Sequence, residues 1–346
     1  MENWQVCIVK KDNKIIDAVK AIDSSCAKIA LITDDNGVLE GVITDYDVRQ
    51  ALLKGKLSDE EVTNIMSANP KTMADDSTDD DILAYMKDRN VRQVPLLDKN
   101  RKLVGLKIRS DFDESTIRRT NPVVIMAGGL GTRLRPLTDN CPKPLLKIGD
   151  KPILERILGS FIHEGFRDFF ISVNYKAEMI EDYFGDGSQW NIKINYLEED
   201  KRLGTAGALS LLPDNLTEPV IVMNGDLLTK VDFRQLLDFH YNRKSEATMC
   251  VREYKYQIPY GVINFNDWRI GEIQEKPIES AFVNAGIYVL NPDVIQAIPN
   301  DTYYDMTTLF NSLIDEDRNV LGFPIREYWM DVGQMDDFRK AGTEFL

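Results

Sequence analysis

Histidine and paired cysteine are scarce in this sequence. It has two histidines, His163 and His240, and four cysteines that lie far apart without a C-x-x-C pair. No serine or cysteine stands in a nucleophile-elbow motif, so a histidine-assisted nucleophile is not indicated. The spacing also gives no support to a zinc site or a disulfide framework. We expect free thiols at Cys7, Cys26, Cys141 and Cys250.

Long apolar segments are also missing. The N-terminus, MENWQVCIVKKDNK, lacks the basic stretch followed by an apolar core that a secretory signal needs. No run approaches the ~20 apolar residues of a membrane span. These absences predict a cytoplasmic location and no membrane partner.

Basic side chains are fewer than acidic ones. The 346 residues include 42 basic and 56 acidic side chains, which gives a formal net charge of −14. Such a charge repels nucleic acid and acidic membranes at long range, which argues against either as the main partner. Anionic small molecules are repelled too. Phosphate-bearing substrates would therefore need local cations, backbone amides and a divalent metal.

The first part of the sequence contains an internal repeat. Shifted by 64 positions, residues 1–58 overlay on residues 59–118. Each copy reads as an amphipathic helix, a strand, a turn, a second strand and another helix. Repeated units this short usually bury their apolar faces against each other. The matched positions are Val19 with Leu83, Ile22 with Met86, Asp34 with Asp98, Leu39 with Leu103, Gly41 with Gly105 and Asp47 with Asp111.

This repeat resembles a tandem pair of CBS domains, small modules that often bind adenine nucleotides, and its strongest match is GVITDYD. The resemblance implies that Thr44 and Asp47 hold the ribose of an adenine nucleotide. A helix N-cap with an acidic N3 partner explains the same two residues equally well. In the second copy, GLKIRSD, Ile108 replaces the threonine and only Asp111 remains. Paired CBS modules often associate across subunits, so a homo-oligomer is expected.

A short charged stretch, FDESTIRRTN, joins the repeat to a region with different patterning. From Pro122 onward, the apolar, β-branched runs VVIMA, DFFISV, IKINYL and PVIVMN alternate with helical stretches. That alternation predicts an α/β fold with a mostly parallel sheet covered by helices on both faces. Ligands of such sheets bind at the carboxyl ends of the strands.

A glycine-rich turn follows the first of these strands. AGGLGTRLRPLT places Arg133 inside the turn, and CPKPLL with Lys143 comes next. Glycines let successive backbone N–H groups approach phosphate oxygens, and an arginine adds a bidentate cation. The segment is neither a Walker loop nor the dinucleotide fingerprint, because no G-K-[ST] follows and Leu134 stands at the third glycine position. The alternative is a tight turn with solvated basic residues.

GGLGTRLRPLT followed by KPLL resembles the signature of the sugar nucleotidyltransferases. The later motifs of that family follow in its order: LGTAGAL, NGD, YGVI, EKP, NAGIYVL and WMDVG. The resemblance covers nearly all of residues 121–346. It implies a Rossmann-like, mostly parallel mixed sheet, the nucleotide-diphospho-sugar transferase fold. It also implies an enzyme that joins a nucleoside triphosphate to a sugar 1-phosphate and releases pyrophosphate.

The resemblance also assigns roles to residues at matching positions. Arg133 would grip the leaving pyrophosphate, Lys143 would steady the α-phosphate, and Lys276 of EKP would contact the sugar phosphate. Asp226 of NGD is a fourth implied catalytic residue. Together with Asp331 of WMDVG it would hold Mg²⁺, which prefers one or two protein oxygens. The other implied substrate contacts are Gly128, Gly129, Gly131, Thr132 and Gly204 on the nucleotide side, and Tyr260, Gly261, Glu275 and Asn284 on the sugar side.

The resemblance is closest to bacterial guanylyltransferases with an N-terminal CBS pair, which include the glucosamine 1-phosphate guanylyltransferases of legionaminic acid synthesis. It favours GTP with glucosamine 1-phosphate, ahead of mannose or heptose 1-phosphate, in bacterial surface-sugar biosynthesis. One alternative is a uridylyl- or thymidylyltransferase of the same fold. Another is a non-catalytic regulatory relative that binds nucleotide sugars. Such regulators usually lose the glycine loop, its basic residues or a metal aspartate, and all of these are present here.

Overall fold

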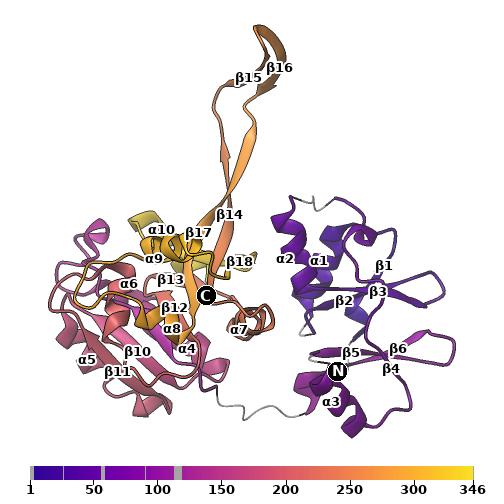
Figure 1. Ribbon diagram of the computed structural model, residues 1–346, viewed down its shortest axis with the longest axis horizontal. Coiled ribbons are helices and arrows are strands. Elements are labelled where there is room, and N and C mark those ends of the chain that lie inside the picture. The colour runs from indigo at the N-terminus through magenta and orange to yellow at the C-terminus, as the bar shows by residue number, and fades with distance from the viewer. Residues whose placement is uncertain (1–3, 26, 56–58, 90, 113–118, 346) are drawn as a thin grey trace. The chain divides into compact units, whose positions relative to one another are not determined.

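The chain consists of two units, which divide between residues 117 and 118. The computed structural model (Figure 1) describes residues 4–25, 27–55, 59–89, 91–112 and 119–345. Cys26, the predicted boundary after residue 58 and most of the predicted linker lie outside the described residues. No disulfide joins the described cysteines, which are Cys7, Cys141 and Cys250.

The first unit contains the predicted repeat. Each copy holds a three-stranded sheet whose first two strands are parallel and whose last two are antiparallel. The first copy consists of β1 (Ile8–Lys10), α1 (Ile15–Ser24), β2 (Ile29–Thr33), β3 (Leu39–Thr44) and α2 (Asp45–Leu53). The second consists of β4 (Met73–Ala74), α3 (Asp79–Asp88), β5 (Gln93–Leu97) and β6 (Leu103–Ile108). Short 3₁₀ helices are η1 (Trp4–Cys7), η2 (Val62–Asn64) and η3 (Arg109–Phe112).

The two copies bury apolar side chains against each other. Leu31 of the first copy shares a core cluster with Leu106 and Ile108 of the second. The Leu103 N–H of the second copy also donates to the Gly37 carbonyl oxygen of the first, at 3.0 Å. The expected packing of each copy on its twin is therefore confirmed.

A seven-stranded sheet organises the second unit, in the order β11-β10-β7-β12-β17-β14-β18. Among its described strands only β17 runs antiparallel to its neighbours. The mostly parallel mixed sheet expected from the sequence is therefore present. Its bounds are β7 (Val123–Met126), β10 (Asp168–Val173), β11 (Lys193–Glu198), β12 (Val220–Asn224), β14 (Ala247–Gln257), β17 (Ile278–Leu290) and β18 (Val320–Ile325).

Helices cover both faces of this sheet, because its β-branched strands are apolar on both sides. On one face Phe161 stacks on Phe233 with ring centroids 3.8 Å apart, and on the other Leu309 and Phe310 join a second core cluster. The bounds are α4 (Ile153–His163), α5 (Ala177–Phe184), α6 (Gly204–Gly207), α7 (Phe233–Asn242), α8 (Pro292–Gln296), α9 (Met306–Asp315) and α10 (Met335–Glu344). No helix in the described part of either unit is both long and apolar enough to cross a membrane.

Short elements complete the second unit and shape its loops. β13 pairs antiparallel with β19, and β8 pairs antiparallel with β9. Their bounds are β8 (Lys147–Ile148), β9 (Lys151–Pro152), β13 (Leu227–Thr229) and β19 (Trp329–Asp331). The 3₁₀ helices are η4 (Thr132–Leu134), η5 (Lys143–Leu145), η6 (Ser188–Trp190) and η7 (Ala208–Leu211).

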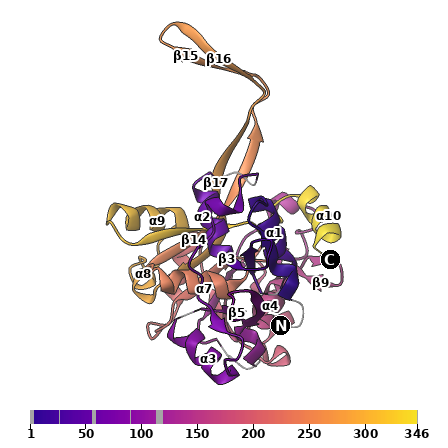
Figure 2. The same cartoon turned by 90° about the vertical axis from the view of Figure 1, so that its right-hand side faces the viewer.

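One long hairpin leaves this sheet. β14 and β17 stay paired beyond it as far as Gln257 and Ile278, and β15 (Gly261–Asn266) and β16 (Arg269–Glu275) form the tip. We call residues 251–284 the arm, which stands out from the second unit in both views (Figure 1, Figure 2). β17 is antiparallel to both β12 and β14, so the arm emerges at the edge of the sheet where the parallel strands end.

Glu164, at the C-cap of α4, is a largely buried carboxyl with a raised pKa. Burial and then the Asp232 carboxylate raise its pKa to about 8, from an ordinary value of 4.5. The folded protein therefore keeps a proton that the unfolded chain releases, and stability present at low pH is lost as pH rises toward 8. Glu164→Gln should remove this loss, because the amide oxygen can still accept the Arg234 N–H. We expect the variant to exceed the parent in unfolding free energy by about 1–3 kcal/mol near pH 8.5 and by little near pH 5.

Urea unfolding at both pH values measures this difference. Glu316→Gln is the matched control, because Glu316 also occupies a helix C-cap, that of α9, but is exposed. A Glu164→Gln variant that is no more stable than its parent near pH 8.5 would show that the buried carboxyl carries no such cost.

Candidate active site

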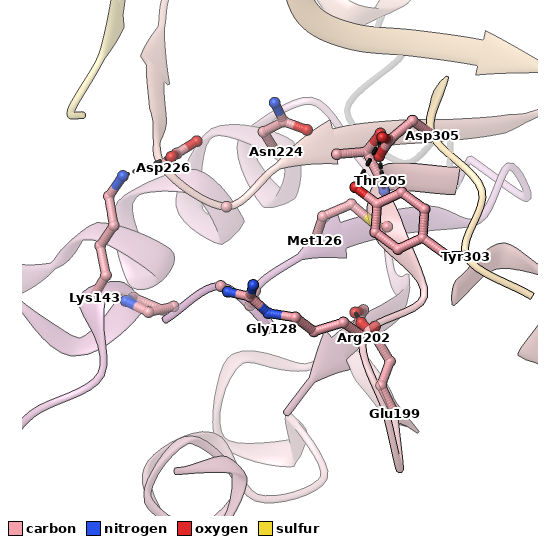
Figure 3. A pocket seen from close by; sticks show the side chains of 16 residues that line it. Met126, Gly128, Lys143, Glu199, Arg202, Thr205, Asn224, Asp226, Tyr303 and Asp305 are labelled. Atoms are coloured by element: carbon pink, nitrogen blue, oxygen red, sulfur yellow. Dashed lines mark hydrogen bonds and ion pairs between the residues drawn. The ribbon is translucent and has the colours of Figure 1, made fainter. Parts of the chain in front are cut away.

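A cavity of about 380 Å³ opens where β7, β10 and β12 end (Figure 3). This is the edge of the sheet at which ligands of parallel α/β folds bind. The cavity is lined by acidic side chains, basic side chains and the backbone of glycine residues. The lining residues are Met126, Ala127, Gly128, Gly129, Lys143, Pro144, Ser172, Glu199, Arg202, Gly204, Thr205, Asn224, Gly225, Asp226, Tyr303 and Asp305.

The glycine-rich turn forms one wall of the cavity. A Cβ on Gly128 would lie 3.0 Å from Glu199 Oε1, whereas Gly129 has open space around it. Gly131 has a φ of +61°, in the left-handed region, and a Cβ there would lie 2.9 Å from Thr138 Cγ2. Thr138 Oγ1 also donates to the Gly131 carbonyl oxygen, at 2.9 Å. Gly128 and Gly129 therefore present backbone to the cavity, while Gly131 shapes the turn without lining it.

Lys143 and Asp226 form an ion pair on the cavity wall. Lys143 is buried at the start of η5, and Asp226 follows the end of β12. Lys143 Nζ lies 2.6 Å from Asp226 Oδ2, and the two side chains point toward each other (Figure 3). Gly225 lets the β12 turn approach β7, because a Cβ there would lie 2.7 Å from the Met126 carbonyl oxygen. A cation and a carboxylate thus stand beside the bare glycine backbone.

Asp331 lies next to this pair, at the end of β19. The N–H of the following residue, Val332, donates to the Asp226 carbonyl oxygen at 2.9 Å. Asp331 Oδ1 is buried and has no hydrogen-bond partner among the described residues. Burial, followed by the Asp226 carboxylate, raises the pKa of Asp331, while Lys143 and Arg133 act against this. Two carboxylates therefore converge with one oxygen left unpartnered.

This arrangement fits a divalent cation held mainly by its substrate. The described residues contain no group of three or more His, Cys, Asp or Glu side chains placed to hold a metal. Mg²⁺ needs no such group, since it commonly takes one or two carboxylates and completes its shell with phosphate oxygens and water. The unpartnered oxygen of Asp331 and its repulsion from Asp226 are what a shared cation would relieve.

Arg133 lies on the same side of the site but does not line the cavity. It belongs to η4, directly after Gly131, together with Thr132, which does not line the cavity either. A Cβ on Gly333 would lie 3.3 Å from both Arg133 Nη1 and Asp331 Oδ1. The structure therefore brings the guanidinium near Asp331 rather than to the cavity wall.

Glu199 is a lining residue that the sequence analysis missed. Ser172 Oγ donates to its Oε1, and the Leu203 N–H donates to its Oε2 at 3.0 Å. The carboxylate is thus held in place beside Gly128, with lone pairs left for a ligand. Glu199 follows β11 directly, so the strand-end rule applied to YLEED could have found it.

Gly204 lines the cavity near Glu199. Its φ is +83°, and a Cβ would lie 2.7 Å from the Tyr304 carbonyl oxygen. Thr205 N–H donates to Asp305 Oδ1 at 3.1 Å, which ties α6 to the start of α9. No role was predicted from the sequence for the remaining polar lining side chains, although LGTAGAL contains Thr205 and NGD contains Asn224; these side chains are Ser172, Arg202, Thr205, Asn224, Tyr303 and Asp305.

The structure does not bring the sugar-side residues to the cavity. Tyr260, Gly261, Glu275 and Lys276 belong to the arm, and no residue of the arm is among the described residues that line the cavity. Asn284 stands at the base of the arm, where its Nδ2 donates to the Tyr288 hydroxyl at 2.7 Å. The reason is the β14–β17 ladder, which carries these residues past the edge of the sheet. Their contact with a sugar phosphate stays a prediction.

In the first unit, Thr44 and Asp47 form a helix cap. The Thr44 N–H donates to Asp47 Oδ2 at 2.8 Å, and Thr44 Oγ1 donates to the same oxygen at 2.7 Å. The Ile108 N–H donates to Asp111 Oδ2 at 3.0 Å in the second copy, so the two aspartates play the same local role. The capping interpretation is therefore confirmed, and nucleotide binding by these residues stays a prediction.

Comparison with known proteins finds two family models in the chain. The model "Nucleotidyl transferase" matches residues 122–346, and the model "CBS domain" matches residues 4–54 and 62–106. Both CBS matches fall in the first unit. The nucleotidyl transferase match includes the whole cavity.

Curated relatives share the second unit. A mannose-1-phosphate guanylyltransferase catalytic subunit beta of Drosophila pseudoobscura pseudoobscura is 34% identical over 231 residues, which is 65% of this chain and 62% of that protein. A mannose-1-phosphate guanyltransferase of Schizosaccharomyces pombe is 36% identical over 233 residues, 64% of each chain. The chain thus spans less than two thirds of the length of these relatives.

Among solved structures, HddC from Yersinia pseudotuberculosis is 28% identical with a TM-score of 0.53, covering 66% of this chain and all of that one. A second structure of HddC, complexed with GMP-PN, matches at 27% identity and the same TM-score. The match of the nucleotidyl transferase model spans well over half of the chain and agrees with the motif order, the sheet and the position of the cavity. The chain belongs to the nucleotidyl transferase family.

Proposed function

We propose that this chain is a sugar-1-phosphate nucleotidyltransferase, which converts a nucleoside triphosphate and a sugar 1-phosphate into a nucleotide-activated sugar and pyrophosphate. The observation that carries the proposal is the convergence of Asp226, Asp331 and Lys143 beside the bare backbone of Gly128 and Gly129. Such a set offers amides and a cation to phosphates and two carboxylates to a metal ion. Membership of the family supports the same reaction.

In this reaction a sugar phosphate oxygen attacks the α-phosphorus, and the bond to pyrophosphate breaks in line. No general base is needed, because a phosphate monoester is already an anionic nucleophile at neutral pH. Catalysis then rests on positioning and on neutralising charge. Lys143 would neutralise the α-phosphate and Arg133 the leaving pyrophosphate. Mg²⁺, held by Asp226 and Asp331, would supply charge neutralisation on the triphosphate.

We propose guanine as the base. A carboxylate accepts two N–H bonds at once, and guanine presents two neighbouring donors, N1–H and the N2 amino group, on one edge. Glu199 is a carboxylate on the cavity wall, beside the glycine backbone. The names of the curated relatives and the HddC complex with GMP-PN support the same choice. GTP is therefore the proposed nucleotide, with uridylyl or thymidylyl transfer as the alternative.

Glu199→Gln tests this assignment. The amide offers one donor and one acceptor, so the second bond to guanine becomes a clash of donors, while uracil N3–H and O4 gain a partner. We expect kcat/KM for GTP to fall by about 10–100-fold and that for UTP to rise. The measurement is kcat/KM for each triphosphate. Glu198→Gln, an exposed neighbour at the end of β11, is the control. Equal losses for all bases would remove Glu199 as the base-reading residue.

Fewer observations bear on the identity of the sugar than on that of the nucleotide. We propose glucosamine 1-phosphate first, from the resemblance to CBS-bearing bacterial guanylyltransferases that serve surface-sugar synthesis. Mannose 1-phosphate, the sugar in the names of the curated relatives, is its main competitor, followed by heptose 1-phosphate. An adenine nucleotide bound by the CBS pair would then act as a regulator of turnover.

The deciding experiment mixes the full chain with each of four triphosphates, a panel of sugar 1-phosphates and Mg²⁺, and measures released pyrophosphate. Pyrophosphate release with GTP and one of the three sugars is the expected result. Binding of nucleotide sugars without any release of pyrophosphate would instead identify a regulatory relative. Repeating the active combination with adenosine nucleotides tests the CBS pair.

A further inference from the structure

The aspartate at the start of α9 turns its side chain away from its own helix. Asp305 occupies the N-cap of α9, where an aspartate usually accepts hydrogen bonds from N–H groups of the first turn. Within the described part of α9 its side chain accepts no such bond. Its Oδ1 accepts the Thr205 N–H of α6 at 3.1 Å, and the Met306 N–H of α9 donates to Thr205 Oγ1 at 2.8 Å. The two helix starts therefore satisfy each other's backbone groups.

Three donors converge on this carboxylate. Besides the Thr205 N–H, the Thr205 hydroxyl donates to Asp305 Oδ1 at 3.2 Å, and the Tyr303 hydroxyl donates to Oδ2 at 2.9 Å. Figure 3 shows dashed lines from Asp305 to both residues. These bonds hold the pKa of Asp305 below its usual value, and the Thr205 N–H contributes most. The carboxylate is therefore charged at neutral pH and has a protein donor on each oxygen.

The segment that contains Thr205 forms one wall of the nucleotide cavity. Backbone hydrogen bonds hold this wall on either side of Thr205. The Tyr304 N–H donates to the Leu203 carbonyl oxygen at 2.8 Å, and the Ala206 N–H donates to the Tyr304 carbonyl oxygen at 2.9 Å. Thr205 itself lines the cavity and is joined to the Asp305 side chain. Asp305 therefore fixes the part of the wall that faces the ligand.

Glu199 takes its orientation from the same wall. The Leu203 N–H donates to Glu199 Oε2 at 3.0 Å, so the carboxylate proposed to read guanine is joined to the wall. Gly204, the next residue, lines the cavity, and a Cβ there would lie 2.9 Å from Asp305 Oδ1. A shift of this turn would displace both the Gly204 backbone and Glu199. A misplacement of about 1 Å can cost on the order of 100-fold.

A carboxylate on this wall does not serve the triphosphate directly. Its negative charge repels phosphate oxygens, and the carboxylates that converge for a metal ion, Asp226 and Asp331, belong to other elements. Asp305 offers a strong acceptor instead, because hydrogen bonds to an ionised acceptor are roughly twice as strong as those between neutral groups. Its charge therefore serves to hold the wall.

We propose that Asp305 is a positioning residue for nucleotide binding, which acts through Thr205 and Gly204 on the surface that receives the nucleoside. The inference rests on the proposed function, because that function assigns the nucleoside to the wall beside Glu199. Asp305 stands in YYDM, between NAGIYVL and WMDVG, and belongs to neither motif.

Isothermal titration calorimetry of the full chain tests the proposal, with each of four nucleoside triphosphates and Mg²⁺ but without sugar phosphate. Asp305→Ala removes all three bonds, and we expect the Kd of the tightest triphosphate to rise by about 10–100-fold. Asp305→Asn should recover most of this loss, because its amide oxygen can accept both Thr205 bonds and its amide nitrogen can donate to the Tyr303 hydroxyl. Thr205→Ala keeps the N–H bond and should weaken binding in the same direction by less.

Asp301→Asn is the matched control. Asp301 belongs to the same loop and lies 2.8 Å from Lys201 Nζ, so it joins the same two segments. It lines a different cavity, of about 460 Å³. Asparagine tolerates its left-handed φ of +51°, and the substitution removes one negative charge, as Asp305→Ala does. We expect the parent's Kd in this variant.

An unchanged Kd in Asp305→Ala would overturn the proposal. An equal rise in Asp301→Asn would also overturn it, because the effect would then come from charge alone, and so would an Asp305→Asn variant as weak as Asp305→Ala. A purely structural role would lower the number of binding sites per chain and leave Kd unchanged.

The proposed function can fail separately. A parent that binds a triphosphate but releases no pyrophosphate with any sugar 1-phosphate would refute the transferase reaction, while the Kd values would still decide the role of Asp305. A parent that binds none of the four triphosphates would refute both.

Discussion

Asp226→Asn is expected to lower kcat by about 10²–10³-fold while the protein stays folded. The amide keeps the shape of the carboxylate, and its oxygen can still accept a hydrogen bond from Lys143, now 2.6 Å from Asp226 Oδ2. What it loses is the negative charge that would hold a metal ion against the triphosphate. Steady-state release of pyrophosphate at saturating Mg²⁺ measures the loss, and circular dichroism checks the fold.

Asp336→Asn provides the control for this variant. Asp336 lies in the first turn of α10 and is exposed. Its substitution by asparagine removes the same unit of negative charge at a position outside the site. Full turnover by Asp226→Asn at saturating Mg²⁺ would refute the proposed metal site, and so would an equal loss in the control. Arg133→Ala should be nearly as inactive, because it removes the cation proposed for the leaving pyrophosphate.

Asp331→Asn should change activity and stability in opposite directions. Burial and Asp226 raise the pKa of Asp331, so its ionised form is unfavourable in the folded protein. Replacing it with a neutral side chain removes this repulsion, and we expect a higher Tm than the parent in the presence of a chelator. Turnover should nevertheless fall by about 10²–10³-fold, because one of the two metal-holding carboxylates is lost.

Thermal unfolding with and without Mg²⁺ separates the two effects. The parent should gain stability from Mg²⁺ and nucleotide together, and Asp331→Asn should gain much less. A variant that is less stable than the parent in chelator would mean that Asp331 serves the fold rather than the site. The Asp336→Asn control should match the parent in both conditions.

The sheet and the nucleotide side of the site could be predicted because their signals are local. Apolar β-branched runs marked the parallel strands, and the strand-end rule placed the glycine turn and Asp226 on one edge. Asp331 is more than a hundred residues away, and the motif WMDVG alone indicated it. Glu199 could have been found by the same strand-end rule. Ser172 could not, because its approach to Glu199 depends on how two strands meet in the folded sheet.

The arm shows what the sequence could not predict. The resemblance to the sugar nucleotidyltransferases implied that YGVI and EKP contact the sugar phosphate. The length over which two strands stay paired depends on their register and on the residues that pack over them. A short motif determines neither of these. The N-terminal repeat gives the opposite case, since the cap formed by Thr44 and Asp47 follows from spacing alone.

β17 continues from the arm into the sheet beside the nucleotide cavity, and its pairing with β14 is irregular between Asn284 and Tyr288. Gly286, near its centre, has a φ of +70°, and a Cβ there would lie only 2.7 Å from Asn224 Nδ2, a group on the cavity wall. Any side chain in place of this glycine would therefore displace Asn224, so the absence of a side chain at position 286 is what lets β17 pack against the cavity wall.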